Sequence, residues 1–139
     1  MAKKQLLVGV NEGAGHPPGY EWSVWFLSTA RDDANRILSD PQYQHVVMQF
    51  QELAREVDPT HSNTCSVKAV DSYYEFRDKG GVLGKINIRV FFSVEKEHKA
   101  IVVLGTIKNE AEGKTPNVDK IRMARRQRKL RAGEYGTIE

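Results

Sequence analysis

The chain has 139 residues, of which 40% are hydrophobic and 28% charged, and its formal net charge is +3. This length and composition fit one globular domain and exclude a disordered or fibrous chain. Its apolar runs, such as Ala100 to Leu104, are far shorter than the roughly 20 residues of a membrane-spanning helix. No signal peptide opens the chain, so we expect a cytoplasmic protein that does not enter a membrane.

The cysteine and histidine content limits the metal chemistry. Cys65 is the only cysteine, which excludes an internal disulfide, and the four histidines show no ligand spacing. We therefore expect no metal site and no cofactor.

Basic residues are concentrated near the end of the chain. The segment from Lys114 to Arg131 holds eight basic residues and one acidic residue, Asp119, whereas the remaining chain holds 13 basic and 17 acidic residues. A cationic element on a mildly acidic body is typical of a surface that binds nucleic acid. A solvated helix face and a docking surface for an acidic protein are the other interpretations.

The first half of the chain predicts a strand followed by two helices. Residues 1–19 are rich in glycine and proline and predict a flexible arm. Aromatic and β-branched residues from Tyr20 to Leu27 predict a strand, and Ser28 or Thr29 can cap a helix that runs through Leu38. A second, amphipathic helix begins at Asp40, as its cap, and ends before Asp58 and Pro59.

The second half predicts three strands and a last helix. After a polar connection over residues 60–70, strands are expected over 73–77, 85–95 and 99–108, joined by short connections that favour an antiparallel meander. In the middle strand, alternation places Ile88, Val90 and Phe92 on a core face and Arg89 on the other. Thr115 is expected to cap the last helix, with Pro116 in its first turn, and Gly133 to end it.

This element order predicts an α+β fold in which helices lie beside an antiparallel sheet, formed by the N-terminal strand and the meander. We expect residues 20–135 to form a single domain between the arm and a tail of residues 136–139.

Strand alignment brings several cations together on one face of this sheet. Arg77 and Arg89, with Lys108 if it faces the same way and Lys85 at the edge, are expected to form one patch. Cations this close repel one another unless an anion binds between them, and phosphate is the obvious anion. The alternative is a set of ordinary surface residues with Glu75 as a cross-strand partner. Of Tyr73 and Tyr74, one could stack a base while the other belongs to the core.

The motifs of the second half resemble those of a known family. They are YEFR at Tyr74 to Arg77, IRVFF at Ile88 to Phe92, IVVLGTIK at Ile101 to Lys108, KTP at Lys114 to Pro116, the basic helix and GEY at Gly133 to Tyr135. In this order they resemble the phage-derived, HigB-like branch of the RelE/ParE toxin superfamily, over about residues 73 to 135. The resemblance implies a RelE-like fold.

The resemblance also implies an activity and partners. Members of this kind are metal-independent ribonucleases that cut messenger RNA on the ribosome, and a helix-turn-helix antitoxin neutralises them. The reaction is attack of the RNA 2′-hydroxyl on the adjacent phosphate, so Arg77 and Arg89 would stabilise phosphoryl charge. Lys108 would act as a cation or proton-transfer group, and Tyr135 as a weaker proton-transfer candidate. The residues expected to hold RNA by charge are Lys85, Arg122, Arg125, Arg126, Arg128 and Lys129.

The sequence departs from the family pattern in its third strand. Leu104 stands where many relatives have histidine, Thr106 where phenylalanine is usual, and Asn109 replaces a second lysine. These differences favour one alternative function, a catalytically degenerate binding module. A second alternative is a ParE-like topoisomerase inhibitor, which would bind protein rather than cleave RNA.

Overall fold

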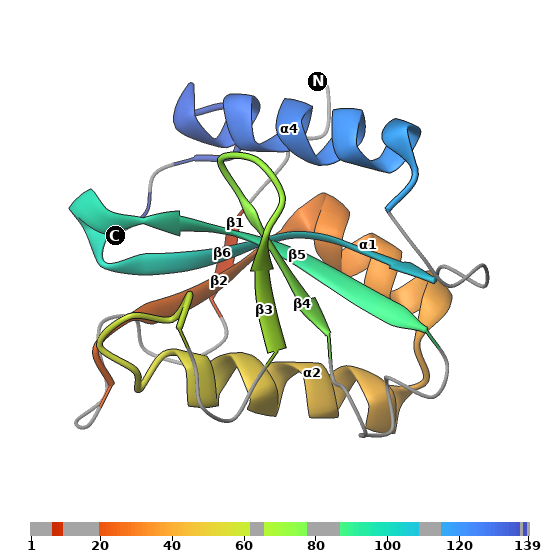
Figure 1. The fold of residues 1–139 in the computed structure, drawn as a ribbon, viewed down its shortest axis with the longest axis horizontal. Helices are drawn as coiled ribbons and strands as arrows, with labels where there is room; N and C mark the ends of the chain where they lie inside the picture. Colours follow the sequence, from red (N-terminus) through yellow and green to blue (C-terminus); the bar gives the residue numbers. More distant parts are fainter. Residues whose placement is uncertain are drawn as a thin grey trace.

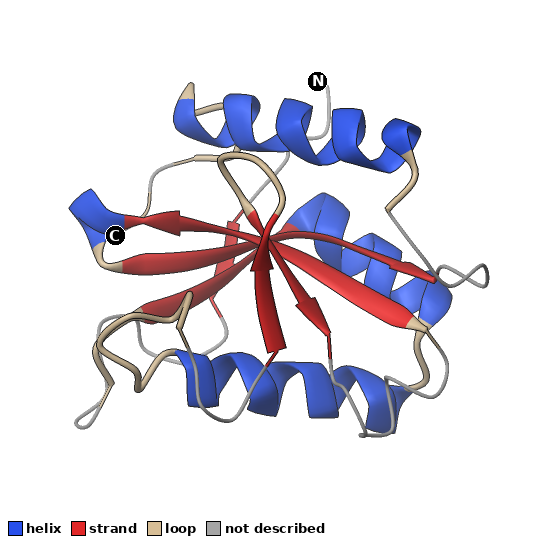
Figure 2. Cartoon of the chain, in the orientation of Figure 1, coloured by secondary structure: helices blue, strands red, loops and turns tan. Residues whose placement is uncertain are grey.

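The computed structural model of the protein describes residues 7–9, 20–61, 66–77, 87–108, 115–136 and 138. A single sheet lies between two helices, with α4 (Asn117–Arg131) on one face and α2 (Asp40–Leu53) on the other (Figure 1). Helix α1 (Ser28–Ile37) packs against the strand that ends at Lys108. Figure 2 shows the strands in the middle of the molecule and the helices outside them. The α+β class predicted from the sequence is confirmed.

The sheet has six strands in the order β1-β2-β6-β5-β4-β3. The pairing of β2 with β6 is parallel, and all the other pairings are antiparallel. The strands are β1 (Leu7–Gly9), β2 (Ser23–Leu27), β3 (Ser66–Ala69), β4 (Tyr74–Arg77), β5 (Ile88–Glu95) and β6 (Ala100–Lys108). The predicted meander is confirmed as β4, β5 and β6, whereas the parallel pairing of β2 makes the sheet mixed rather than wholly antiparallel.

Two strands were not predicted. β1 lies within the stretch interpreted as an arm, and β3 lies within the polar connection of residues 60–70. Both are edge strands of three or four residues, too short for a periodic pattern, and they are recognisable only once the neighbouring strand is in place.

The helix ends follow local chemistry with three corrections. Helix α1 begins at Ser28 directly after Leu27 and has no side-chain cap, where Ser28 or Thr29 was expected to provide one. Ser39, and not Asp40, caps α2: its hydroxyl accepts from the Gln42 backbone N–H while the Gln42 side chain accepts from Ser39 N–H. The residue before α4 is Pro116, and Thr115 makes no capping bond there. Gly133, with φ of +80°, ends α4 as predicted.

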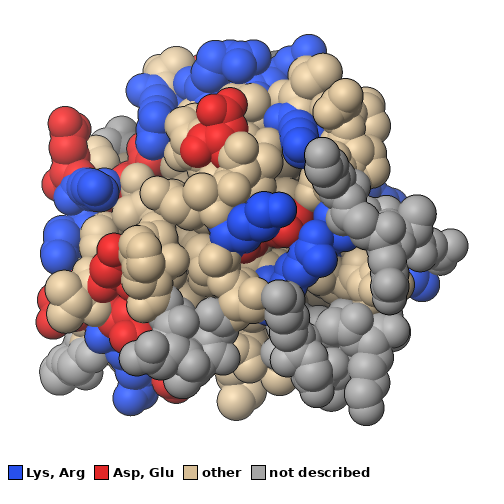
Figure 3. Space-filling model, viewed as in Figure 1, with Lys and Arg blue, Asp and Glu red and all other residues tan. Residues whose placement is uncertain are grey.

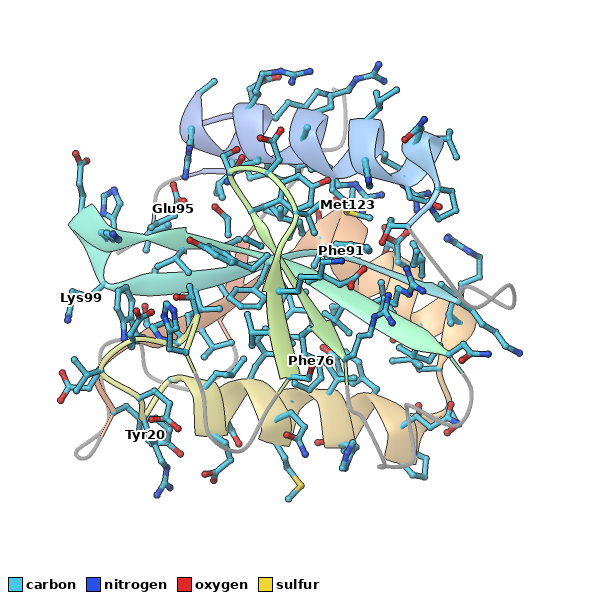
Figure 4. The ribbon with its side chains drawn as sticks, in the orientation of Figure 1. Tyr20, Phe76, Phe91, Glu95, Lys99 and Met123 are labelled. Carbon is cyan, nitrogen blue, oxygen red and sulfur yellow. The ribbon has the colours of Figure 1, made fainter. Side chains whose placement is uncertain are left out.

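The sheet is buried on both faces, where the sequence predicted one core face for β5. Towards α2, Phe50 packs against Phe76 and Phe92. Towards α4, Phe91 lies beneath the helix on the side of Met123, as the sticks of Figure 4 show. The second face is covered because α4 folds back over the meander, so Arg89 of β5 lies beneath a helix and not in solvent.

Within the part of the chain that the structure describes, no helix combines the length and the apolar character needed to cross a bilayer.

Candidate functional site

The sheet brings Arg77 and Arg89 together, as the sequence predicted. Phe76 of β4 is paired with Val90 of β5, so the next position along each strand places the two arginines side by side on the α4 face. Both reach the carboxylate of Glu75: Arg77 Nε lies 3.0 Å from Oε2, and Arg89 Nη1 lies 3.6 Å from Oε1.

The two arginines differ in burial. Glu75 and Arg89 are each 3% exposed, whereas the Arg77 side chain is 34% exposed. Burial lowers the pKa of Arg89, an effect that the charge of Arg77 reinforces and that Glu75 opposes. Arg89 therefore lies behind Glu75 in the interior, and Arg77 lies towards the surface.

Thr115 completes this cluster from the segment before α4. Its hydroxyl donates to Glu75 Oε1 at 2.5 Å and accepts from Arg89 Nη1 at 3.0 Å. This contact explains the correction at the helix start: the hydroxyl predicted as a cap bonds to the sheet instead. Nothing in the local sequence reveals this contact, because Thr115 and Glu75 are 40 residues apart.

A hollow of about 220 Å³ lies beside the cluster. We call it the β4 hollow; its lining residues are Lys68, Ala69, Val70, Glu75, Arg77, Thr115 and Lys120. Three of these residues are basic and one is acidic, and Arg89 adds a fourth positive charge behind Glu75. Figure 3 shows Lys and Arg atoms gathered beneath α4 around a smaller acidic area on this face. The net positive charge suits an anion such as phosphate.

Lys68 and Lys120 were not singled out from the sequence. Lys68 is paired with Glu75 across β3 and β4, and Lys120 comes from the second turn of α4. The strand that carries Lys68 was itself not predicted, so its register with Glu75 could not be anticipated. Lys120 was counted in the basic segment, and only the packing of α4 directs attention to it.

The structure does not bring the other predicted catalytic residues to the β4 hollow. Lys108 is exposed and paired with Ile88, which places it on the α2 face of the sheet, opposite to Arg89. Tyr135 is 1% exposed and its hydroxyl lies 3.4 Å from Thr29 Oγ1 on α1. Lys85, predicted at the edge of the patch as an RNA contact, lies outside the described residues.

The basic residues of α4 divide between its two sides. Arg126 points inward, where it donates to Asp33 Oδ2 at 2.6 Å and to the Leu104 carbonyl at 2.8 Å, so it ties α4 to α1 and β6. Arg122 is bound to Asp119 on its own helix. Arg125 and Arg128 are exposed and Lys129 is half-buried, and these three remain candidates for RNA contact.

The two neighbouring tyrosines are separated by the sheet. Tyr73 is 1% exposed and donates to the Lys120 carbonyl at 3.1 Å, and burial raises its pKa to about 12, with smaller effects of Asp71 and Glu75. Tyr74 is half-buried on the other face, where it stacks on Phe92. Tyr73 therefore belongs to the core, and Tyr74 is the member of the pair that reaches the surface.

A larger hollow, of about 610 Å³, lies near the end of α4 and includes Tyr74 in its lining. Its charged lining residues, Glu95, Lys96, Glu97, His98 and Arg131, balance one another when histidine is neutral. The β4 hollow is therefore the better anion site, although it is the smaller of the two.

Among the described residues, no group of three or more histidine, cysteine, aspartate or glutamate side chains is placed to hold a metal ion.

Comparisons with known proteins give a similarity to solved structures and no match to a family. No protein-family model and no curated protein matches the chain. Among solved structures, the chain is similar to the toxin–antitoxin complex RelBE2 from Mycobacterium tuberculosis, with 21% sequence identity and a TM-score of 0.42. The match covers 66% of this chain and 99% of that chain.

Proposed function

We propose that the protein is the toxin of a toxin–antitoxin pair, a metal-independent endoribonuclease that cuts messenger RNA. The observation that carries the proposal is the meeting of Arg77 and Arg89 at the β4 hollow, where Lys68 and Lys120 add positive charge. The resemblance of residues 73 to 135 to HigB-like toxins supports the same reaction class.

In this reaction the RNA 2′-hydroxyl attacks the adjacent phosphorus while the bond to the 5′-oxygen breaks. The products are a 2′,3′-cyclic phosphate and a 5′-hydroxyl end, with one proton leaving the attacking oxygen and one reaching the leaving oxygen. Negative charge grows on the phosphoryl oxygens, and fixed positive groups that stabilise it are worth the most where water is partly excluded. Arg77 at the surface of the hollow and Arg89 behind it would supply this charge.

The rest of the RNA would be held by charge on α4. Arg125, Arg128 and Lys129 lie along the helix that also carries Lys120, so a single strand could run from the β4 hollow along α4. Lys108, exposed at the end of β6 on the α2 face of the sheet, lies away from this path and would not transfer a proton in the hollow. A ribosome-bound messenger RNA in the cytoplasm and a helix-turn-helix antitoxin are the partners that the family resemblance favours.

The test is to induce the protein in growing cells and to map RNA 5′ ends, beside cleavage of single-stranded RNA by the purified protein in EDTA. We expect toxicity and new 5′-hydroxyl ends that disappear with Arg77→Ala. Arg31→Ala, on the exposed side of α1, is the matched control and should cut as the wild type does. Cleavage that persists in Arg77→Ala, or that requires a divalent metal, would refute the proposal.

A second function is favoured by one observation. Arg89 is bound to Glu75 and Thr115 in the interior, and Leu104, which stands where relatives have histidine, is fully buried. A degenerate module would bind RNA through the same hollow without cutting it. Such a module would shift RNA in a gel and leave cells unharmed, whereas toxicity with intact RNA would indicate a topoisomerase inhibitor.

A further inference from the structure

We propose that Glu75 and Thr115 are positioning residues, which hold the guanidinium groups of Arg77 and Arg89 in the orientation that receives an RNA phosphate. The inference rests on the proposed function and deepens it, because neither residue was assigned a catalytic or RNA-binding role from the sequence. It is carried by the hydrogen bonds around the Glu75 carboxylate.

The two oxygens of Glu75 serve different partners. Oε2 accepts from Arg77 Nε at 3.0 Å, and Oε1 accepts from the Thr115 hydroxyl at 2.5 Å. A carboxylate held on both oxygens has a fixed plane, and that plane fixes the direction from which Arg77 approaches. Glu75 therefore defines the orientation of the arginine that lines the hollow.

Thr115 connects Arg89 to the carboxylate of Glu75 and thereby fixes the orientation of the Arg89 guanidinium. A hydroxyl has one proton to donate, so donation to Glu75 leaves its oxygen to accept from Arg89 Nη1 at 3.0 Å. The resulting chain of bonds runs from Arg89 through Thr115 to Glu75, which Arg77 joins from the other side. The segment before α4 is thereby linked to two strands of the sheet.

Charge gives a second reason for this arrangement. Arg77 and Arg89 lie side by side on the adjacent strands β4 and β5, and like charges placed opposite each other repel. One carboxylate between them offsets part of this repulsion and keeps both side chains in place before an anion arrives. Lys68, Lys120 and the arginines still outnumber the carboxylate, so the hollow remains positive.

The role fits positioning better than proton transfer. Both Glu75 oxygens accept hydrogen bonds from neighbouring protein groups, and the side chain is 3% exposed. A general base needs an oxygen within hydrogen-bond reach of the 2′-hydroxyl, and a carboxylate this buried offers little accessible surface for such a contact.

The test compares Thr115→Val, which removes the hydroxyl at constant shape, with Thr115→Ser, which keeps it. Single-stranded RNA is the substrate, and kcat and KM are measured separately at fixed ionic strength. We expect Thr115→Val to lower kcat about tenfold with KM changed less than about twofold, because loss of a hydrogen bond to a charged group acts mainly on the oriented transition state. Thr115→Ser should recover most of the activity.

A control variant and a spectroscopic measurement test whether the effect on kcat comes from the orientation of the arginines. Thr29→Val removes a threonine hydroxyl near Tyr135, away from the hollow, and should leave kcat unchanged. The Nε–H signals of the arginines in ¹⁵N NMR spectra report directly on the contacts: the Arg77 signal should shift and exchange faster in Glu75→Gln, and the Arg89 signal should change in Thr115→Val.

The outcomes distinguish this inference from the proposed function. If the wild type leaves RNA intact, the proposed nuclease fails, whereas the NMR signals still show whether Glu75 and Thr115 hold the arginines. Wild-type kcat in Thr115→Val, or equal losses in Thr115→Val and Thr115→Ser, would overturn the positioning role. Unchanged arginine signals in Glu75→Gln would do the same.

Discussion

Two buried carboxylates, Asp33 and Glu75, each hold two arginines, and they differ in what lies beyond the ion pair. Asp33 on α1 binds Arg126 and Arg36, and Arg126 also donates to the Leu104 carbonyl of β6. Glu75 on β4 binds Arg77 and Arg89 at the wall of a hollow that Lys68 and Lys120 also line.

The comparison shows that pairing alone does not distinguish a scaffold from a binding site. Both carboxylates are 3% exposed, and each has one partner that is more buried than the other. Around Asp33 the more buried arginine joins two helices and a strand. Around Glu75 the more exposed arginine faces a positively charged hollow. We therefore propose that the first cluster serves stability and that the second serves the proposed RNA site, and the following changes test that division.

Replacing Arg126 with methionine should produce the largest change. Among the described residues, Asp33 would then keep Arg36, whose side chain is 63% exposed, as its ion-pair partner. A buried carboxylate without its main partner costs about 3–5 kcal/mol of unfolding free energy. Urea unfolding measures this loss. Arg125→Met, at the exposed neighbouring position, should stay within about 0.5 kcal/mol of the wild type. A loss below about 1 kcal/mol in Arg126→Met would contradict the scaffold role.

Arg77→Ala should show the opposite pattern. Loss of one group that stabilises transition-state charge should lower kcat/KM about 100- to 1000-fold. The unfolding free energy should change by about 1 kcal/mol or less, because Arg77 is a third exposed and Glu75 keeps Arg89 and Thr115 as partners. Cleavage assays and urea unfolding on the same preparation decide the outcome. If Arg77→Ala lost stability but kept the wild-type kcat/KM, the Glu75 cluster would serve stability and not the proposed RNA site.

Gly105→Ala should cause a smaller loss of stability near Arg126. A methyl group at Gly105 would meet the end of the Met123 side chain and Arg126 Nη1, the latter at 2.7 Å. Met123 is flexible, whereas Arg126 is held by Asp33, so we expect a loss of about 1–3 kcal/mol from overpacking. In the Arg126→Met background the same substitution should cost less, and a double-mutant cycle measures the difference. Equal costs in both backgrounds would mean that Arg126 is not held rigidly.

Lys68→Ala and Lys120→Ala should have the smallest effects, on RNA affinity rather than on stability. Each lysine that neutralises a phosphate of single-stranded RNA contributes about 0.7 to the slope of log affinity against log salt concentration. The double variant should therefore lower the slope by about 1.4 in titrations of a single-stranded oligonucleotide. Lys96→Ala, on the exposed turn between β5 and β6, is the matched control. An unchanged slope in the double variant would place the RNA elsewhere.

The meander illustrates how far local patterns reach in this protein. Strands β5 and β6 were predicted nearly to their ends because their side chains alternate or are continuously apolar, and the turn between them is short. The same patterns placed Arg77 and Arg89 on neighbouring strands, which the structure confirms. Strand β3 was missed because four half-exposed or exposed residues carry no comparable pattern, and Lys68 was missed with it.

The candidate site depended more strongly on long-range contacts. Thr115 was predicted to cap α4, but its hydroxyl is bound to Glu75 on a distant strand. Arg126 was expected to bind RNA, but its position in the helix turns it towards Asp33. Lys108 was expected to join the other cations if it faced the same way, but the register of β6 directs it to the opposite face. In each case the sequence identified a polar or charged side chain able to form the contact, but it did not indicate which way that side chain points.

The sequence by itself determined the fold class, the meander, the helices and the concentration of positive charge near the last helix, because these depend on periodicity, end residues and composition within a short stretch. Tertiary structure decided that β2 runs parallel to β6, that Tyr73 is core while Tyr74 is not, and that Glu75 and Thr115 meet between two arginines. The physical reason is that a side chain's partner across a sheet or beneath a helix is set by how the elements pack, and that packing is the joint result of the whole chain.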